Sequence, residues 1–284
     1  MHIQIINSRP SSDGAGVKLQ RVHGFRDNSL DPFLMLDEIN SDNPDDYIAG
    51  FPPHPHRGLE TLTYIRAGGF EHQDHMGNQG KIREGEAQWM SAGKGVIHSE
   101  KPLLGQNALH GFQLWINLPA ANKMQPAAWK DIPLSELPWQ KLQTNNADSS
   151  NGSHASVKVI AGSLQLQSQT YSGPLQTTAP TRVADLQLPA NQNVTLDAVS
   201  EENLLIFVYQ GELIIQGQSV GKRQMAKISD AGTLQLSATE NTGMLILSGQ
   251  PLKEPVAHHG PFVMNTAEEI QQAMADYQAG VLTD

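Results

Sequence analysis

Two short pairs of residues with metal-binding side chains occur in the first half of the sequence. His54 and His56 are separated by one residue, and His98 and Glu100 repeat that spacing some forty residues later. In a β-strand, residues two apart point to the same face and lie roughly 6–7 Å apart along it. Two such pairs on facing strands would supply three imidazole nitrogens and one carboxylate oxygen. That donor set suits a divalent transition metal and leaves one or two coordination positions open.

The alternative for each pair is that its histidines are surface or hydrogen-bonded side chains with no ligand. A second pair at the same spacing favours the metal. The chain contains no cysteine, which excludes thiolate metal sites, disulfides and a cysteine nucleophile. The donor set leaves Fe(II), Mn, Ni, Cu and Zn open, and the sequence does not choose among them.

Composition excludes several classes of protein. The formal net charge is −10, and no run of Lys and Arg provides the clustered positive charge that binding to nucleic acid needs. The first residues lack the charged start and apolar core of a signal peptide, and no apolar run approaches about twenty residues. We therefore expect a cytoplasmic protein that binds neither membranes nor nucleic acid directly.

The elements that must position the two pairs are short strands. Runs such as ETLTYIRA, FQLWINLP and NLLIFVYQGELIIQG are interrupted by turn residues every eight to twelve positions, which predicts an all-β sandwich or barrel. A helix is expected near the end, where Thr266 and Glu269 form a capping box. Ile270, Met274 and Tyr277 give that helix an apolar stripe, and Gly280 ends it. A second helix is expected in PLSELPWQKLQ, residues 133–143.

The two halves of the chain align loosely as diverged copies. The polar stretch at residues 143–154 predicts a linker, so we expect domains at residues 1–142 and 155–284. No histidine occurs between His154 and His258. The second domain is therefore expected to keep the β-barrel and lack the metal ligands.

Several motifs together resemble the pirin family of the cupin superfamily. The resemblance is dense from about residue 30 to residue 120 and returns at residues 255–280. It is carried by DPFLMLDE, PHPHRGLETLTY, GNQGKIREGEAQWMSAGKGVIHSE, HGFQLWINLP and HHGPFVMNTAEEIQQAMADYQAG. It implies a bicupin: two face-to-face β-barrels with one metal ion, in the N-terminal barrel. The family's ligand pattern falls on His54, His56, His98 and Glu100.

The resemblance also implies an activity, that of a quercetin 2,3-dioxygenase. A flavonol would bind the metal through its 3-hydroxyl group, Glu100 would take the proton, and O₂ would open the heterocycle with loss of carbon monoxide. An apolar wall for this planar substrate is expected from Phe51, Trp89, Met90 and Phe112, each of which could equally belong to the barrel core. Some pirins act instead as transcription cofactors or enzyme-binding partners, so the alternative is a metal- and redox-dependent regulator that binds a protein.

Other polar residues near the two pairs have roles that the sequence leaves open. Glu60 competes with Glu100 for the carboxylate position, because it shares strand parity with the histidines, but the family pattern favours Glu100. His72, Asp74 and His75 are expected in a loop near the barrel mouth. Gln113 could line the pocket or be a core polar residue. Of the remaining histidines, His110 lies in the same strand as Gln113, and His258 and His259 are expected to pack or lie on the surface.

Overall fold

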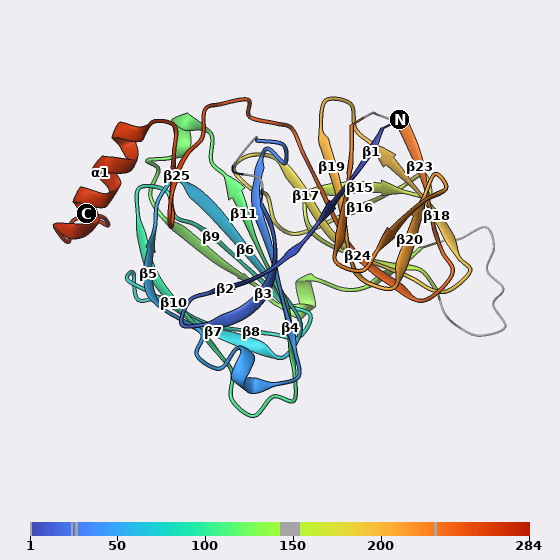
Figure 1. The fold of residues 1–284 in the computed structure, drawn as a ribbon, viewed down its shortest axis with the longest axis horizontal. Helices are drawn as coiled ribbons and strands as arrows, with labels where there is room; N and C mark the ends of the chain where they lie inside the picture. The colour runs from blue at the N-terminus through green and yellow to red at the C-terminus, as the bar shows by residue number, and fades with distance from the viewer. Residues whose placement is uncertain (1, 24, 26–27, 143–153, 230–231) are drawn as a thin grey trace. The chain divides into compact units, whose positions relative to one another are not determined.

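The structure is a computed structural model that describes residues 2–23, 25, 28–142, 154–229 and 232–284. Nearly all of the regular structure is antiparallel strand, which confirms the all-β expectation (Figure 1). No helix among the described residues is long and apolar enough to span a membrane. The expected linker, apart from His154, lies outside the described residues.

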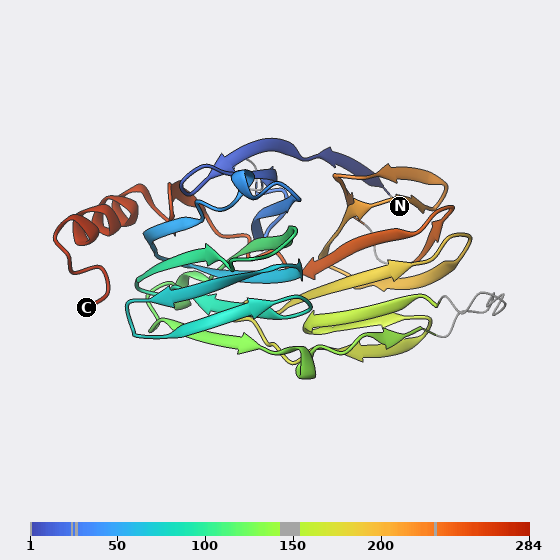
Figure 2. The ribbon, with the colours of Figure 1, turned by 90° about the horizontal axis from the view of Figure 1, so that it is seen from below.

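Contacts between residues divide the chain into two compact units. The first unit comprises Arg9–Leu134 and Leu252–Asp284, and the second comprises Met1–Ser8 and Ser135–Pro251. These units differ from the expected domains because the first eight residues belong to the second unit and the last 33 residues belong to the first. Strand β1 (Ile3–Asn7) pairs with β22 (Gln224–Ile228) of the second unit, and the C-terminal segment packs on the first unit. Figure 2 shows the red C-terminal segment beside the blue and green strands.

The first unit consists of a larger sheet, a smaller sheet and one hairpin. The larger sheet contains, in hydrogen-bonded order, β12 (Ala128–Ile132), β9 (Ala87–Ser91), β6 (Leu59–Ala67), β11 (Leu109–Asn117), β4 (Phe33–Ser41), β3 (Val17–His23) and β2 (Arg9–Asp13). The smaller sheet contains β5 (Phe51–His56), β10 (Val96–Pro102), β7 (Gly69–Asp74) and β8 (Gln79–Arg83). The hairpin consists of β25 (Ala257–His259) and β26 (Phe262–Met264).

A shared apolar core holds the larger and the smaller sheet of the first unit together. Ile39 and Ile65 from the larger sheet cluster with Phe51, Phe70 and Ile82 from the smaller one, and all five are buried. Burial of this kind contributes roughly 25 cal/mol per Å² of apolar surface. The smaller sheet carries the His54–His56 and His98–Glu100 pairs. The core therefore fixes the positions of these two pairs.

The second unit has the same two-sheet plan and a continuous apolar core. One sheet contains β1, β22, β19 (Asn203–Gln210), β24 (Thr242–Gly249), β17 (Thr181–Leu188), β14 (Ser156–Ala161) and β13 (Gln140–Lys141). The other contains β16 (Gln169–Ser172), β15 (Ser163–Leu166), β18 (Asn193–Ala198), β23 (Gly232–Ala238), β20 (Glu212–Ile215) and β21 (Gln218–Gly221). No cluster of potential metal ligands lies among its described residues.

The two expected helices have different outcomes. Helix α1 spans Ala267–Gln278, and both hydrogen bonds of the capping box between Thr266 and Glu269 are present. Residues 133–142 instead form a single 3₁₀ turn at Leu134–Glu136, followed by β13. The second helix was therefore a wrong prediction. Pro138 explains it, because proline lacks an amide hydrogen and disfavours helical geometry at the residue before it.

The capping box gives a test of the last element of the fold. We expect Thr266→Ala to destabilise α1 by about 1 kcal/mol, because the Glu269 amide loses the side-chain oxygen that accepts its hydrogen bond. Hydrogen exchange of the amides in the first turn measures the change. Thr266→Ser keeps the hydroxyl and should exchange like the wild type. Equal protection in the alanine and serine variants would contradict the prediction.

Candidate metal centre

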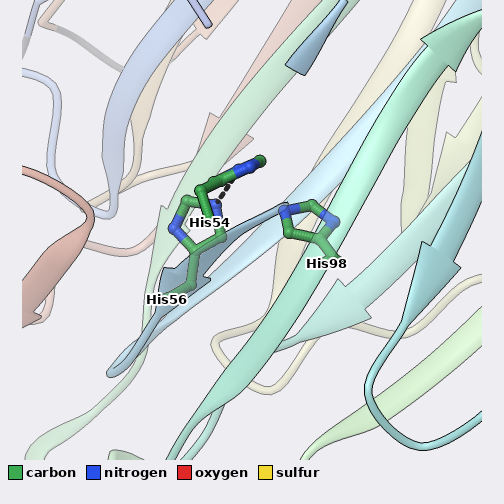
Figure 3. Close-up of side chains that lie close together, drawn as sticks. All are labelled: His54, His56 and His98. Carbon is green, nitrogen blue, oxygen red and sulfur yellow. Dashed lines mark hydrogen bonds between the residues drawn. The ribbon is translucent and has the colours of Figure 1, made fainter. Parts of the chain in front are cut away.

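Strand pairing brings the two pairs of the sequence together. β5 and β10 are antiparallel neighbours, with His54 opposite His98 and His56 opposite Val96. The register shifts between His98 and Glu100. Figure 3 shows the rings of His54 and His56 from one strand turned toward the ring of His98 from the other. The sequence prediction that these three histidines converge agrees with this geometry.

The three rings lie within reach of one ion. The Nε2 atoms of His54 and His56 are 3.1 Å apart, and the ring centre of His98 lies 4.4 Å from that of His54 and 5.0 Å from that of His56. One ligand atom from each residue can be chosen so that all three lie within 4.8 Å of one another. Imidazole nitrogens bound to a single ion at about 2.0–2.1 Å are at most about 4.2 Å apart, a range that includes the 3.1 Å between the Nε2 atoms of His54 and His56.

Backbone carbonyls fix the orientation of two of the rings. Nδ1 of His54 lies 2.8 Å from the Pro52 carbonyl oxygen, and Nδ1 of His56 lies 3.2 Å from the Pro261 carbonyl oxygen. A carbonyl oxygen only accepts, so each Nδ1 carries the proton and donates it. The lone pair of each neutral ring is then on Nε2, the atom that faces the cluster. Metal-ligating histidines are commonly held by such a hydrogen bond.

Burial keeps the rings of His56 and His98 neutral. Burial and, to a smaller extent, the neighbouring His54 lower the pKa of His56 to about 3. Burial likewise lowers the pKa of His98 well below its ordinary value, with smaller contributions from His56, His54 and His72. Neutral imidazoles have free lone pairs at pH 7, so no proton has to be displaced before a metal binds.

The donor set fits a metal ion. Nε2 of His98 is buried, and no hydrogen-bond partner for it is found among the described residues. A buried polar atom without a partner costs free energy unless a ligand satisfies it. Three imidazoles with a buried carboxylate nearby suit a divalent transition ion.

Glu100 is buried beside the cluster, but its carboxylate is held by neutral side chains. Gln113 donates from Nε2 to Oε2 at 2.9 Å and to Oε1 at 3.2 Å, and the Thr63 hydroxyl lies 3.5 Å from Oε1. Among the described residues, Glu100 groups with His98 and His72, whereas His54 and His56 group with His98 alone. Glu60 is buried in β6 and belongs to neither group.

His72 is the residue whose place in the cluster was not expected. It lies in β7, opposite Glu100 of β10, rather than in a loop. Its Nδ1 is 3.4 Å from Nδ1 of His98, and its ring stacks on Trp129 with centres 6.0 Å apart. Burial lowers the pKa of His72, so this ring is also neutral. Alternation along EHQD could have shown that His72 and Asp74 share a face, but not that β7 pairs with β10.

The neighbouring polar residues have structural partners. Asp74 also lies in β7, where its carboxylate accepts hydrogen bonds from the amides of Met76 and Asn78 and so shapes the following turn. His75 is exposed and accepts from the Ile97 amide, and His110 lies 3.1 Å from Glu38. His258 stacks on Phe25 with ring centres 3.9 Å apart, and His259 is exposed.

A cavity of about 520 Å³ opens onto His54 and His56. Its volume suits a small-molecule ligand. It is lined by His54, His56, Gln113, Asp13, Gly14, Arg21, Phe25, Met35, Phe51, Pro52, Pro53, Trp115, His258, Gly260 and Pro261. Phe51 is part of the wall as expected. Trp89, Met90 and Phe112 are not, and the aromatic side chains in their place are Phe25 and Trp115. Met90 and Phe112 are buried.

The C-terminal hairpin β25–β26 is anchored beside His56. The Val263 amide donates to the Arg57 carbonyl oxygen at 3.0 Å. The Arg57 guanidinium donates to Asp276 of α1 at 2.6 Å, to the Leu282 carbonyl oxygen at 3.1 Å and to the Lys94 carbonyl oxygen. These contacts hold the segment whose Pro261 carbonyl orients His56.

A buried lysine completes this anchor. Lys123 donates to the carbonyl oxygens of Gly58 at 2.8 Å and Val263 at 2.9 Å, and to Asn117 at 2.7 Å. Burial lowers the pKa of Lys123 to about 8. Gly58 has a φ of +81°, and a Cβ there would overlap the Val263 carbonyl oxygen, so the close approach of the hairpin requires glycine.

Comparison with known proteins places the chain in a family. The Pirin family model matches residues 16–116, and the model of the Pirin C-terminal cupin domain matches residues 183–283. A Vibrio cholerae protein with the provisional name quercetin 2,3-dioxygenase is 46% identical over 98% of this chain and 95% of its own length. The chain belongs to the pirin family. Human pirin is 34% identical over 95% of this chain and 90% of its own length.

A solved structure agrees with the pirin assignment. The crystal structure of quercetin 2,3-dioxygenase from Acinetobacter baumannii superposes with a TM-score of 0.87 at 31% identity, over 99% of this chain and 97% of that one. The bicupin fold expected from the motifs is therefore confirmed. The His and Glu cluster of this pirin-family chain supports a divalent metal.

The lowered pKa of His56 predicts how the metal-free protein responds to acid. The ordinary pKa of 6.5 applies in the unfolded chain, and the folded value is about 3. Below pH 6.5 the unfolded chain binds a proton that the folded chain does not, so stability falls as the pH drops from 6.5 towards 3. Urea unfolding followed by tryptophan fluorescence reports on the first unit, which holds three of the four tryptophans, Trp89, Trp115 and Trp129. His56→Gln should reduce this slope, and an unchanged slope would contradict the assignment.

The anchor of the hairpin predicts an effect on metal affinity. Arg57→Gln removes the links to α1, which frees the Pro261 carbonyl, so we expect zinc affinity to fall about 10-fold. Titration calorimetry of the folded variant measures the affinity. Arg83→Gln makes the same substitution at an exposed position of β8 and should leave the affinity unchanged. Equal zinc affinities in the two variants would show that the anchor does not act on His56.

Proposed function

We propose that this chain is a metal-dependent dioxygenase that opens flavonols such as quercetin with O₂. The observation that carries the proposal is the placement of two histidines, His54 and His56, in the lining of a cavity walled by aromatic side chains. The name of the Vibrio cholerae relative and the match to the Acinetobacter baumannii enzyme support the same activity.

Each part of the site has a role in this proposal. His54, His56 and His98 would hold the ion, with Glu100 as the expected fourth ligand, and Fe(II) is the ion we favour over Mn, Ni, Cu or Zn. The bound ion would supply a Lewis acid that makes the flavonol 3-hydroxyl group more acidic, and a redox partner for O₂. Phe25, Phe51 and Trp115 offer flat apolar surfaces to the rings of the substrate.

Glu100 is the proposed general base. Its carboxylate is buried and accepts hydrogen bonds from Gln113, whose side chain also lines the cavity. Gln113 thereby links the carboxylate to the lining of the cavity. Glu100 takes the hydroxyl proton, O₂ reacts with the resulting flavonolate, and the heterocycle opens with release of carbon monoxide. The reaction incorporates both oxygen atoms and needs no external reductant.

The first experiment is oxygen uptake by Fe(II)-loaded protein given quercetin, with carbon monoxide measured in parallel. We expect uptake to match carbon monoxide release and to be lost in His56→Ala. Glu100→Gln should bind iron and turn over about 10²-fold to 10⁴-fold more slowly, because the base is removed. Full turnover in Glu100→Gln would exclude the proposed base.

An absence of uptake with iron demonstrably bound would contradict the dioxygenase. That result would favour the alternative function, a metal- and redox-dependent regulator that binds a protein partner. The net charge of −10 suits a protein partner better than a nucleic acid.

A further inference from the structure

The cavity beside the histidines also has a charged end that the proposed reaction does not use. Asp13, Gly14 and Arg21 line the same cavity as His54 and His56. Asp13 is the last residue of β2 and Arg21 lies in β3, and these two strands form a hairpin at one edge of the larger sheet. The proposed metal ligands come from the smaller sheet instead. The cavity is therefore lined by two sets of polar side chains with different chemistry.

The guanidinium group of Arg21 is held in a fixed orientation. Its Nε and Nη2 atoms donate to the two carboxylate oxygens of Asp37 at 2.7 and 2.6 Å, and Nη2 also donates to Asp13 at 2.5 Å. Asp37 lies directly opposite Arg21 in β4 and is 3% exposed. Because a buried carboxylate that loses its partner costs several kcal/mol, about 3–5 in typical cases, Arg21 does not turn away from Asp37.

Part of this guanidinium group remains available to a ligand. A guanidinium has five N–H groups, and the contacts with Asp37 and Asp13 use the one on Nε and the two on Nη2. The two N–H groups on Nη1 have no hydrogen-bond partner among the described residues. Since the Arg21 side chain lines the cavity, Nη1 is the atom that can donate to an oxygen atom of a molecule bound there.

Asp13 provides an acceptor next to this donor. Its Oδ2 accepts from Arg21, its Oδ1 accepts from the Gly14 amide at 2.8 Å, and a carboxylate oxygen can accept a second hydrogen bond. The turn after Asp13 fits closely against the start of β5. Gly14 has a φ of +57°, and a Cβ there would overlap the Gly50 carbonyl oxygen and the ring of Phe51. This close fit fixes Asp13 beside the cavity.

An aromatic wall runs through the same cavity to the metal ligands. The ring of His258 stacks on Phe25 with centres 3.9 Å apart, and Phe25 meets Trp115 edge to face at 6.1 Å. Trp115 in turn meets His56 edge to face at 5.1 Å. All four side chains line the cavity. A planar molecule can pack on this wall with one part at the histidines and another part remote from them.

We propose that Asp13 and Arg21 recognise two adjacent hydroxyl groups on the part of the substrate that is remote from the metal. One hydroxyl group donates to the Asp13 carboxylate, and its neighbour accepts from Nη1 of Arg21. A carboxylate and a guanidinium in contact present an acceptor and a donor side by side, which matches the two neighbouring oxygens of a catechol ring. Their opposite charges offset each other, so a neutral polar group suits this end of the cavity. The inference rests on the proposed function and narrows its substrate class to flavonols that carry a catechol, such as quercetin.

Binding of two flavonols to the zinc-loaded protein tests this recognition without turnover. Galangin has the reacting ring of quercetin but no hydroxyl group on the pendant phenyl ring. We expect galangin to bind about 10-fold more weakly than quercetin, because Asp13 and Arg21 then lack their hydrogen-bond partners in the ligand. Titration calorimetry in the absence of oxygen measures both affinities.

Two variants assign the preference to these residues. Asp13→Ala removes the acceptor, and Arg21→Lys keeps a positive charge beside Asp37 but removes Nη1. Each variant should lose most of the preference for quercetin and keep the wild-type affinity for galangin. Asp42→Ala removes an exposed carboxylate of the same unit and should keep the full preference. Circular dichroism establishes that each variant is folded.

Equal wild-type affinities for quercetin and galangin would overturn the inference. A preference for quercetin that survives in both folded variants, Asp13→Ala and Arg21→Lys, would overturn it as well.

Oxygen uptake by the iron-loaded protein separates this inference from the function on which it rests. Uptake with equal kcat/KM for the two flavonols would overturn the recognition by Asp13 and Arg21 and leave the dioxygenase intact. A binding preference that depends on these two residues, without any oxygen uptake, would support the recognition and contradict the dioxygenase. Binding of neither flavonol would contradict both.

Discussion

The register between β5 and β10 is the constraint on which the site depends. Because His54 lies opposite His98, the spacing of two residues within each strand becomes a cluster of rings across two strands. A shift of one residue would turn every side chain of one strand to the opposite face. The apolar core shared by the two sheets prevents such a shift, since Phe51 of β5 is one of its members.

Burial and hydrogen bonding act together on this cluster. Burial lowers the pKa values of His56 and His98, and backbone carbonyls decide which nitrogen of His54 and His56 bears the proton. A site with the same residues on an exposed sheet would lack both effects. Its histidines would titrate near neutral pH, and metal binding would compete with protons.

Local rules in the sequence were sufficient for much of the fold and for the convergence of His54, His56 and His98. Alternation along strands placed His54 beside His56, and the capping box placed the start of α1. The failures depend on contacts between distant segments. His72 joins the cluster only because β7 pairs with β10, and Phe25 and Trp115 form the cavity wall in place of residues closer to the ligands in sequence. The position of the C-terminal segment follows from Arg57 and Lys123, whose partners lie more than a hundred residues away.

The hydrogen bond between His56 and the Pro261 carbonyl has a consequence for how the protein is made. The ring of His56 is oriented by a residue that the ribosome adds 205 positions later, after all of the second unit has been synthesised. The nascent chain therefore exposes its histidines well before their final geometry exists. The hydrogen bond that orients His56 can form only after Pro261 has been added to the chain.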